Sequence, residues 1–229
     1  MNFLAIDSFC QVLSVAVVKG DEVFYQEADA GVRHCELVIS LIENQLTRAC
    51  LKPAELDGVL CMGGPGSFTG LRIGYSTAKA LALSLSIPFA SVPTLDCIAF
   101  RDTEKFECDR LFLALIQARK NAYFYAFFKG KIRLTPDKDA DTAVIKLEIQ
   151  EYLNSGYNKI ILSGPGAVDF MNSLPELREN LIPLYQNKGY AEELISIAKT
   201  RKIPDNNSRE FLYSGPEYIR KTDAELNLM

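Results

Sequence analysis

Two parts of this 229-residue chain follow the same order of elements, and this repetition constrains the fold more than any other feature. Residues 3–20 (FLAIDSFCQVLSVAVVKG) and 111–130 (LFLALIQARKNAYFYAFFKG) both give an apolar strand, a short polar turn, a second strand and a closing Lys-Gly. Residues 58–71 (GVLCMGGPGSFTGL) and 160–171 (IILSGPGAVDFM) then both give a strand, a Gly-Pro-Gly loop and a helix start. A Gly-Pro-Gly triplet alone recurs as a turn. The preserved order of hairpin and glycine loop indicates an internal duplication.

The pattern of apolar residues predicts further elements on both sides of these repeats. Alternating or continuous apolar runs predict strands, and apolar residues three and four positions apart predict helices. The expected strands are 3–7, 12–18, 23–27, 58–62 and 88–92, and the expected helices are 36–50, 68–86, 94–100 and 191–202, the last ended by Pro204. The charged segment 101–110 breaks the pattern, which places a lobe boundary there.

These elements predict an α/β protein with a duplicated actin-like fold (ASKHA, ribonuclease H-like) in two lobes. The lobes are expected to cover residues 1–105 and 106–229, with the last residues packing back on the N-terminal lobe.

Charge and cysteine content exclude several classes of protein. The net charge is −4 and no basic stripe follows the sequence, so the chain is not expected to grip nucleic acid alone. If RNA is involved, a partner is expected to supply most of the positive charge. The six cysteines show no CxxC spacing, which argues against a zinc ribbon or a thioredoxin-type site. No signal peptide or long apolar segment is present, so we expect a cytoplasmic protein without membrane contact.

The first glycine loop, which contains Gly64 and Gly66, resembles a phosphate-binding loop but fails both common tests. A P-loop requires a lysine that is absent here, and the glycine spacing is one residue too long for a dinucleotide fingerprint. Ser67 is expected to cap the following helix, whose first N–H groups could also hold an anion. Asp7, at the end of the first strand, either holds a hydrated magnesium ion or forms a turn.

The helix expected at 68–86 is unusually apolar, because Arg72 and Lys79 are its only charged residues. A stripe of small side chains occupies every fourth position: Gly70, Gly74, Ala78 and Ala82. Larger apolar side chains occupy the other face: Leu71, Tyr75, Leu83 and Leu85. A helix that is apolar all round is buried all round. The cover is either another part of this chain or a partner protein.

Nucleophilic and metal chemistry find little support in the sequence. His34 is the only histidine, so any Ser–His or Cys–His catalysis would depend on it. Its neighbour Cys35 does not make a dyad by adjacency alone. Zinc sites normally need three or more ligands in a recognisable cluster, and no such cluster is apparent.

Several segments closely resemble the bacterial TsaB (YeaZ) family: FLAIDSF, GVLCMGGPGSFTGLRIGYSTAKALAL, IPFASVPTLD and the late GPEYIR. The resemblance is strong over residues 1–100, fair at 111–128 and looser afterwards except near 215–220. It implies the duplicated actin-like fold and a non-catalytic subunit that supports TsaD. TsaD transfers threonylcarbamoyl to the adenosine next to the anticodon of tRNA, and TsaE is an associated ATPase. The resemblance therefore implies TsaD as direct partner, and TsaE and tRNA as partners reached only through the complex.

The resemblance also bears on individual residues. The two metal-binding histidines of TsaD correspond to Thr94 and Ile98 here, and Gln117 stands where most relatives keep an aspartate. The resemblance thus implies no metal and no cofactor, and a degenerate phosphate loop at Asp7, Gly64, Gly66 and Ser67.

In the family, the first two N-lobe helices meet TsaD, which places the partner interface on the helices at 36–50 and 68–86. The implied interface residues are Leu37, Leu41, Gly70, Leu71, Arg72, Gly74, Tyr75 and Lys79. A homodimer through the same face is expected when the chain is alone, and Tyr75→Asp is expected to abolish TsaD binding without loss of folding. The alternative is an enzyme, either a glycopeptidase-like metalloprotease or a small ATPase or sugar kinase of the actin-like fold.

Overall fold

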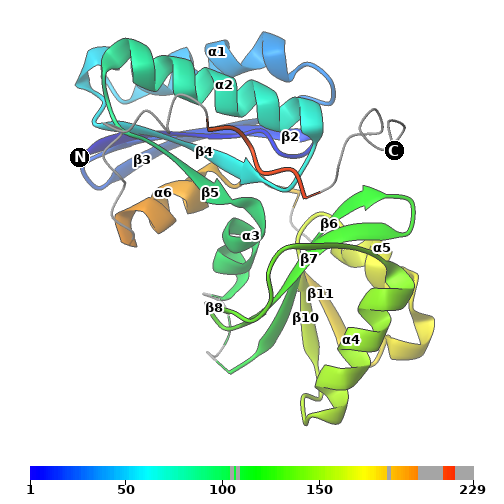
Figure 1. Cartoon of the computed structure of the whole chain (residues 1–229). Coiled ribbons are helices and arrows are strands. Elements are labelled where there is room, and N and C mark those ends of the chain that lie inside the picture. The colour runs from blue at the N-terminus through cyan, green and yellow to red at the C-terminus, as the bar shows by residue number, and fades with distance from the viewer. Residues whose placement is uncertain (104–105, 107–108, 185–186, 201–213, 220–229) are drawn as a thin grey trace. The chain divides into compact units, whose positions relative to one another are not determined.

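A computed structural model describes residues 1–103, 106, 109–184, 187–200 and 214–219 (Figure 1). The chain divides into two compact units. The first comprises Met1–Cys97 with Asn187–Pro216, and the second comprises Ile98–Gln186 with Glu217–Met229.

The first unit is built on a five-stranded sheet with the order β3-β2-β1-β4-β5. The first three strands form an antiparallel meander, and the last two run parallel to β1. The central strands are buried on both faces, which explains why they read as continuous apolar runs. The strands are β1 (Asn2–Asp7), β2 (Val12–Lys19), β3 (Glu22–Asp29), β4 (Gly58–Gly64) and β5 (Phe89–Pro93).

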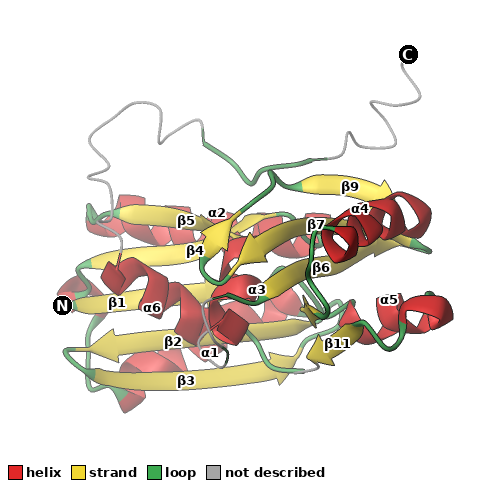
Figure 2. Cartoon of the chain, turned by 90° about the horizontal axis from the view of Figure 1, so that it is seen from below, coloured by secondary structure: helices red, strands yellow, loops and turns green. Residues whose placement is uncertain are grey.

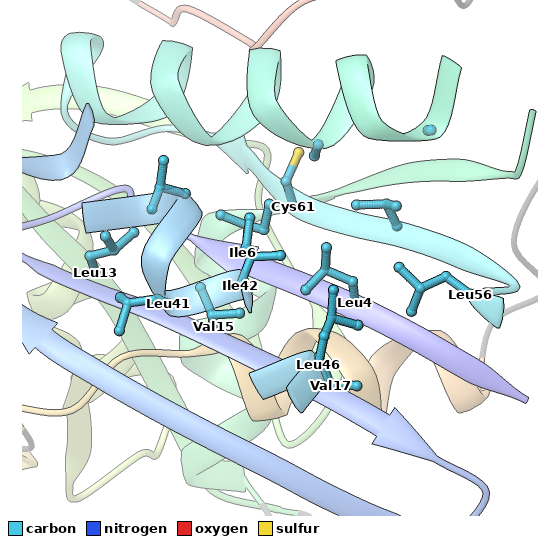
Figure 3. Close-up of a cluster of buried hydrophobic side chains, with 14 of the residues drawn as sticks. Leu4, Ile6, Leu13, Val15, Val17, Leu41, Ile42, Leu46, Leu56 and Cys61 are labelled. Atoms are coloured by element: carbon cyan, nitrogen blue, oxygen red, sulfur yellow. The ribbon is translucent and has the colours of Figure 1, made fainter. Parts of the chain in front are cut away.

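Helices cover both faces of this sheet. Helices α1 (His34–Arg48) and α2 (Phe68–Leu85) pack on one face, and α6 (Ala191–Thr200) packs on the other (Figures 1 and 2). The core under α1 and α2 combines aliphatic side chains of α1 with those of β1, β2 and β4 (Figure 3). A short 3-10 turn, η1 (Pro53–Glu55), leads from α1 into β4.

The second unit has a sheet with the order β11-β10-β6-β7-β8, and β9 also pairs with β7. Its core joins the inner face of the sheet to aliphatic and aromatic side chains of α4 and α5. The strands are β6 (Leu111–Arg119), β7 (Ala122–Lys129), β8 (Ile132–Arg133), β9 (Lys138–Asp141), β10 (Ile160–Ser163) and β11 (Leu181–Leu184). The helices are α4 (Thr142–Asn154), α5 (Ala167–Asn172) and the 3-10 turn η2 (Pro175–Leu177).

The duplication expected from the sequence is confirmed by the pairing of the strands. In each unit an antiparallel hairpin (β1–β2 or β6–β7) is followed by a parallel strand beside its first member (β4 or β10). Both parallel strands lead through a glycine loop into a helix. The order β3-β2-β1-β4-β5 is that of the actin-like fold.

The boundary between the units differs from the expected one. It falls between Cys97 and Ile98, inside helix α3 (Thr94–Thr103), rather than after residue 105, which itself lies outside the described residues. The later part of α3 belongs to the second unit because its side chains pack there: Ile98 lies against Gly164, and Lys131 lies over the ring of Phe100. Residues 187–216 group with the first unit.

Candidate functional site

Asp7, the candidate magnesium ligand, is fully buried at the end of β1, and both of its carboxylate oxygens accept hydrogen bonds. Oδ1 accepts from the backbone N–H of Phe9 at 3.3 Å. Oδ2 accepts from Ser14 Oγ at 3.1 Å and from the backbone N–H of Tyr190 at 2.6 Å. Ser14 Oγ in turn accepts from the backbone N–H of Ala191 at 3.1 Å.

These contacts make the Asp7 carboxylate a cap for helix α6. The N–H groups at a helix start have no partner within the helix, and they carry partial positive charge that favours a carboxylate. A second carboxylate holds the segment that leads into α6, because the N–H of Gly189 donates to Glu27 Oε2 at 2.9 Å. Glu27 also accepts from the hydroxyl of Tyr25, and burial together with this hydrogen bond raises the pKa of Tyr25 above its ordinary value.

The first glycine loop is fitted to the β1–β2 turn. Ser67 N donates to the carbonyl of Phe9 at 2.7 Å, and a Cβ on Gly66 would lie 2.8 Å from that same carbonyl oxygen. Gly64 has a φ of 107°, which favours glycine. Ser67 Oγ accepts from Gly70 N at 3.2 Å, so the predicted helix cap is confirmed.

The second glycine loop makes the equivalent approach in the second unit. A Cβ on Gly164 would lie 2.4 Å from the carbonyl oxygen of Leu115, and a Cβ on Gly166 would lie 3.1 Å from the N atom of Gln117. Both loops are therefore glycine-rich because each one crosses the backbone of its own hairpin closely.

The two positions at which the sequence resemblance implied that metal ligands are missing, Thr94 and Ile98, do not fit a metal. Thr94 and Ile98 are both fully buried, and a neutral hydroxyl with an alkyl side chain cannot replace two imidazoles. Within the described residues, no group of three His, Cys, Asp or Glu side chains is placed to hold a metal ion. His34 is buried, and its Nε2 lies 2.8 Å from the carbonyl oxygen of Cys10, so the ring links α1 to the β1–β2 turn.

The small-residue stripe of α2 also faces this turn. A Cβ on Gly70 would lie 2.1 Å from the carbonyl oxygen of Ser8, and a Cβ on Gly74 would lie 2.1 Å from Ser8 Oγ. Ser8 Oγ donates to the carbonyl of Gly70 at 2.8 Å. The glycines of the stripe thus allow close packing against Ser8, which follows strand β1. This part of α2 is covered by the same chain and not by a partner protein.

This packing corrects the partner face expected from the sequence. The side chains of Leu41, Leu71 and Tyr75 are buried in the first unit. Gly70 and Gly74 lie against Ser8. All five residues therefore face the interior of this chain. The ring of Tyr75 meets that of Phe89 edge-on at 5.0 Å, and its pKa is raised by burial. Because Tyr75 is buried, we now expect Tyr75→Asp to disturb folding, contrary to the expectation from the sequence, since the substitution would bury a charge.

The outer side of α1 and α2 carries a different set of residues. Arg72 is exposed, and its guanidinium lies 3.7 Å from the centre of the Phe68 ring. Lys79 is partly buried and donates to the carbonyl of Ser214 at 2.7 Å, while Leu37 is partly buried against the core. Three large apolar side chains are exposed: Ile39 at 49%, Phe68 at 39% and Leu83 at 47%. The interface prediction did not include these three, although Phe68, Arg72, Ser76 and Leu83 follow the spacing of one helix face.

Comparisons with known proteins show which family the chain resembles. The model of the family "TsaD: tRNA N6-adenosine threonylcarbamoyltransferase" matches residues 27–173. The TsaB protein of Bacillus subtilis is 28% identical over 98% of this chain and 96% of its own length, and that of Buchnera aphidicola is 27% identical over 92% and 97%. A YeaZ-like protein of Pseudomonas aeruginosa superimposes with a TM-score of 0.74 at 19% identity, covering 96% of this chain and 99% of that structure.

The fold and the site first define a class of protein. It is a duplicated actin-like protein in which the acid at the end of the first strand accepts hydrogen bonds from the start of a helix of the same chain. Among the described residues, no helix has the length and hydropathy needed to cross a bilayer. The family match then places the chain more narrowly. It belongs to the TsaD family and, within it, to the TsaB (YeaZ) proteins.

Proposed function

We propose that this chain is a non-catalytic subunit that binds and supports TsaD in the formation of threonylcarbamoyladenosine on tRNA. The similar proteins from Bacillus subtilis and Buchnera aphidicola are named tRNA threonylcarbamoyladenosine biosynthesis protein TsaB. The observation that supports a non-catalytic role is the engagement of Asp7 by Tyr190 N and Ser14, together with Thr94 and Ile98 at the former ligand positions. The metalloprotease and ATPase alternatives have no comparable observation in their favour.

The exposed side of α1 and α2 is the surface that we propose for TsaD. It combines apolar side chains with the cations Arg72 and Lys79, as in an interface with an apolar centre and a polar rim. An exposed apolar surface of this kind also favours self-association, so we propose a homodimer through the same face when TsaD is absent. In this proposal TsaE and tRNA join through the complex, which acts in the cytoplasm.

The test is co-purification with TsaD of the same organism, using charge substitutions at exposed positions. Ile39→Asp and Leu83→Asp place a carboxylate on the proposed face and should abolish co-purification without changing the melting temperature. Leu147→Asp on α4 is the matched control, because Leu147 is exposed in the second unit, and it should bind normally. If the first two variants stay folded and bind TsaD like the wild type, the proposed interface is wrong.

A second assay tests the non-catalytic role. The purified chain, given threonylcarbamoyl-adenylate and tRNA, should form no modified nucleoside, whereas addition of TsaD should restore the reaction. Modification by the chain alone would show that it is itself an enzyme.

A further inference from the structure

One end of the second sheet gathers basic side chains from four separate segments. The parallel and antiparallel pairings place the starts of β6, β10 and β11 and the end of β7 at the same end of the sheet. Counting the terminal residue of each strand and the three beyond it, this end carries five cations: Arg110, Lys129, Lys131, Lys159 and Arg178. Two carboxylates, Asp109 and Glu179, accompany them. The net side-chain charge of this basic end is therefore +3, in a chain whose total is −4.

The duplicated fold provides an internal comparison for this charge. The corresponding end of the first sheet, counted in the same way, carries one cation, Lys19, and four carboxylates: Asp21, Glu22, Glu55 and Asp57. Its net side-chain charge is −3. The two ends share their framework, including the hydrogen bond from the glycine after the hairpin to the residue before it: Gly20 N to Met1 O at 3.2 Å, and Gly130 N to Arg110 O at 3.0 Å. The fold does not require cations at this place.

The basic end is also accessible. Arg110, Lys131, Lys159 and Arg178 are exposed. Lys129 pairs with the exposed Asp109 at 3.0 Å, and Lys159 donates to the backbone carbonyl of Glu179. Such surface contacts are weak and readily exchanged for contacts to another anion. Since neighbouring strands lie about 4.8 Å apart, four adjacent strand ends form a row roughly 14 Å long.

We propose that this basic end contacts the phosphate backbone of RNA, and that within the complex it helps to hold the tRNA. This inference rests on the proposed function for the choice of ligand. A row of Arg and Lys side chains with the amides of Asn158 and Asn180 is the composition that contacts phosphates. The surface reads no base sequence, so its contribution is electrostatic and depends on salt. The overall acidity of the chain keeps this contribution small unless TsaD binds the same RNA.

The test uses the triple variant Arg110→Gln, Lys131→Gln, Arg178→Gln and a tRNA transcript that accepts the modification. The affinity of the complex with TsaD is measured as a function of salt. Loss of about three phosphate contacts should lower the salt slope of log K by about 2, and binding at about 0.1 M salt should then be roughly 100-fold weaker if the two curves meet near 1 M salt. A control with the same charge change, Lys52→Gln, Lys120→Gln, Lys199→Gln, alters exposed lysines elsewhere and should bind like the wild type. Arg110→Lys with Lys131→Arg keeps the charge and should also bind normally.

Three results would overturn the inference. The triple variant could bind tRNA with wild-type affinity and salt slope. The triple variant and the control could weaken equally, which would indicate an effect of net charge alone. The triple variant could lose TsaD while tRNA binding by the assembled complex is unchanged, which would show that the basic end meets an acidic protein surface. If the wild-type chain does not bind TsaD at all, the proposed function fails separately. The RNA contact is then tested on the chain alone at low salt, where the wild type should retain tRNA and the triple variant should not.

Discussion

The close approach of α2 to the β1–β2 turn predicts that Gly70→Ala destabilises the protein. The new Cβ would lie 2.1 Å from the carbonyl oxygen of Ser8, so the helix must move by roughly 1 Å to restore a normal contact. Overpacking of this kind costs about 1–3 kcal/mol. The shift also disturbs the buried 2.8 Å hydrogen bond from Ser8 Oγ to Gly70 O, which contributes about 1 kcal/mol. Alanine returns up to about 1 kcal/mol through its helix propensity.

The net loss is about 2 kcal/mol, which corresponds to a urea midpoint about 1 M lower if the m-value is about 2 kcal/mol/M. Far-UV circular dichroism during urea unfolding measures it. Ser76→Ala on the exposed side of the same helix is the control and should change stability by less than about 0.5 kcal/mol. A Gly70→Ala variant that unfolds at the same urea concentration as the wild type, with an unchanged m-value, would refute this account of the stripe.

The neighbouring glycine distinguishes a backbone contact from a side-chain contact. At Gly74 the new Cβ meets Ser8 Oγ at 2.1 Å, but with that oxygen removed its nearest neighbours are Ser8 Cβ at 3.2 Å and Ile6 Cγ2 at 3.7 Å. Ser8→Ala should therefore rescue Gly74→Ala and should not rescue Gly70→Ala. Equal behaviour of the two pairs in a double-mutant cycle would contradict the geometry.

Three further predictions concern buried polar groups. Asp7→Asn should destabilise the protein by about 2 kcal/mol and increase hydrogen exchange in α6, because an amide NH₂ would face a donor; unchanged exchange would speak against the cap. Tyr75→Asp should lower the melting temperature of the chain alone, whereas Leu83→Asp should not; the reverse order would mean that the faces of α2 are assigned wrongly. Burial raises the pKa of several tyrosines in the folded state, so stability present below about pH 10 should be lost as pH rises further, and part of the phenolate absorbance should appear only together with loss of circular dichroism; complete ionisation of all ten tyrosines before unfolding would contradict this. The residues concerned are Tyr25, Tyr75, Tyr123, Tyr125 and Tyr152.

The elements that could be predicted are those with a local signal. The hairpins, glycine loops and helices of the first unit follow from alternation, helical spacing and turn residues within short windows. Helix α4 was not predicted, and neither were the short strands β9 and β11. Strand β9 has the polar sequence KDAD and β11 contains a proline, so only pairing with a neighbouring strand defines them.

The orientation of α2 could not be derived from its sequence. The small-residue stripe and the row with Leu71 and Tyr75 were expected to face different neighbours, yet both lie on the buried side. A helix that contacts a sheet and a second helix buries a wide arc of its surface, and the width of that arc depends on the neighbours. The basic end was missed for a related reason. Its cations come from positions up to 68 residues apart, Arg110 to Arg178, and only the sheet brings them together.

Asp7 shows why a residue in a nucleotide-binding position does not by itself indicate catalysis. The structure needs an acceptor there, because the N–H group of Tyr190, 183 residues away, is buried against it at the start of α6. An unsatisfied buried N–H costs about 1–3 kcal/mol, so loss of the carboxylate would be opposed even if the chain never bound magnesium. The same argument holds for the glycine loop, where contact with Phe9 requires Gly66 and a φ of 107° favours glycine at position 64. In the second unit the glycine loop and the acid do not occur together. Its glycine loop retains the close approach to its hairpin, whereas Gln117 stands where an acid was expected. The groups that a side chain contacts, rather than its identity, therefore decide whether such a site is a catalytic or a structural one.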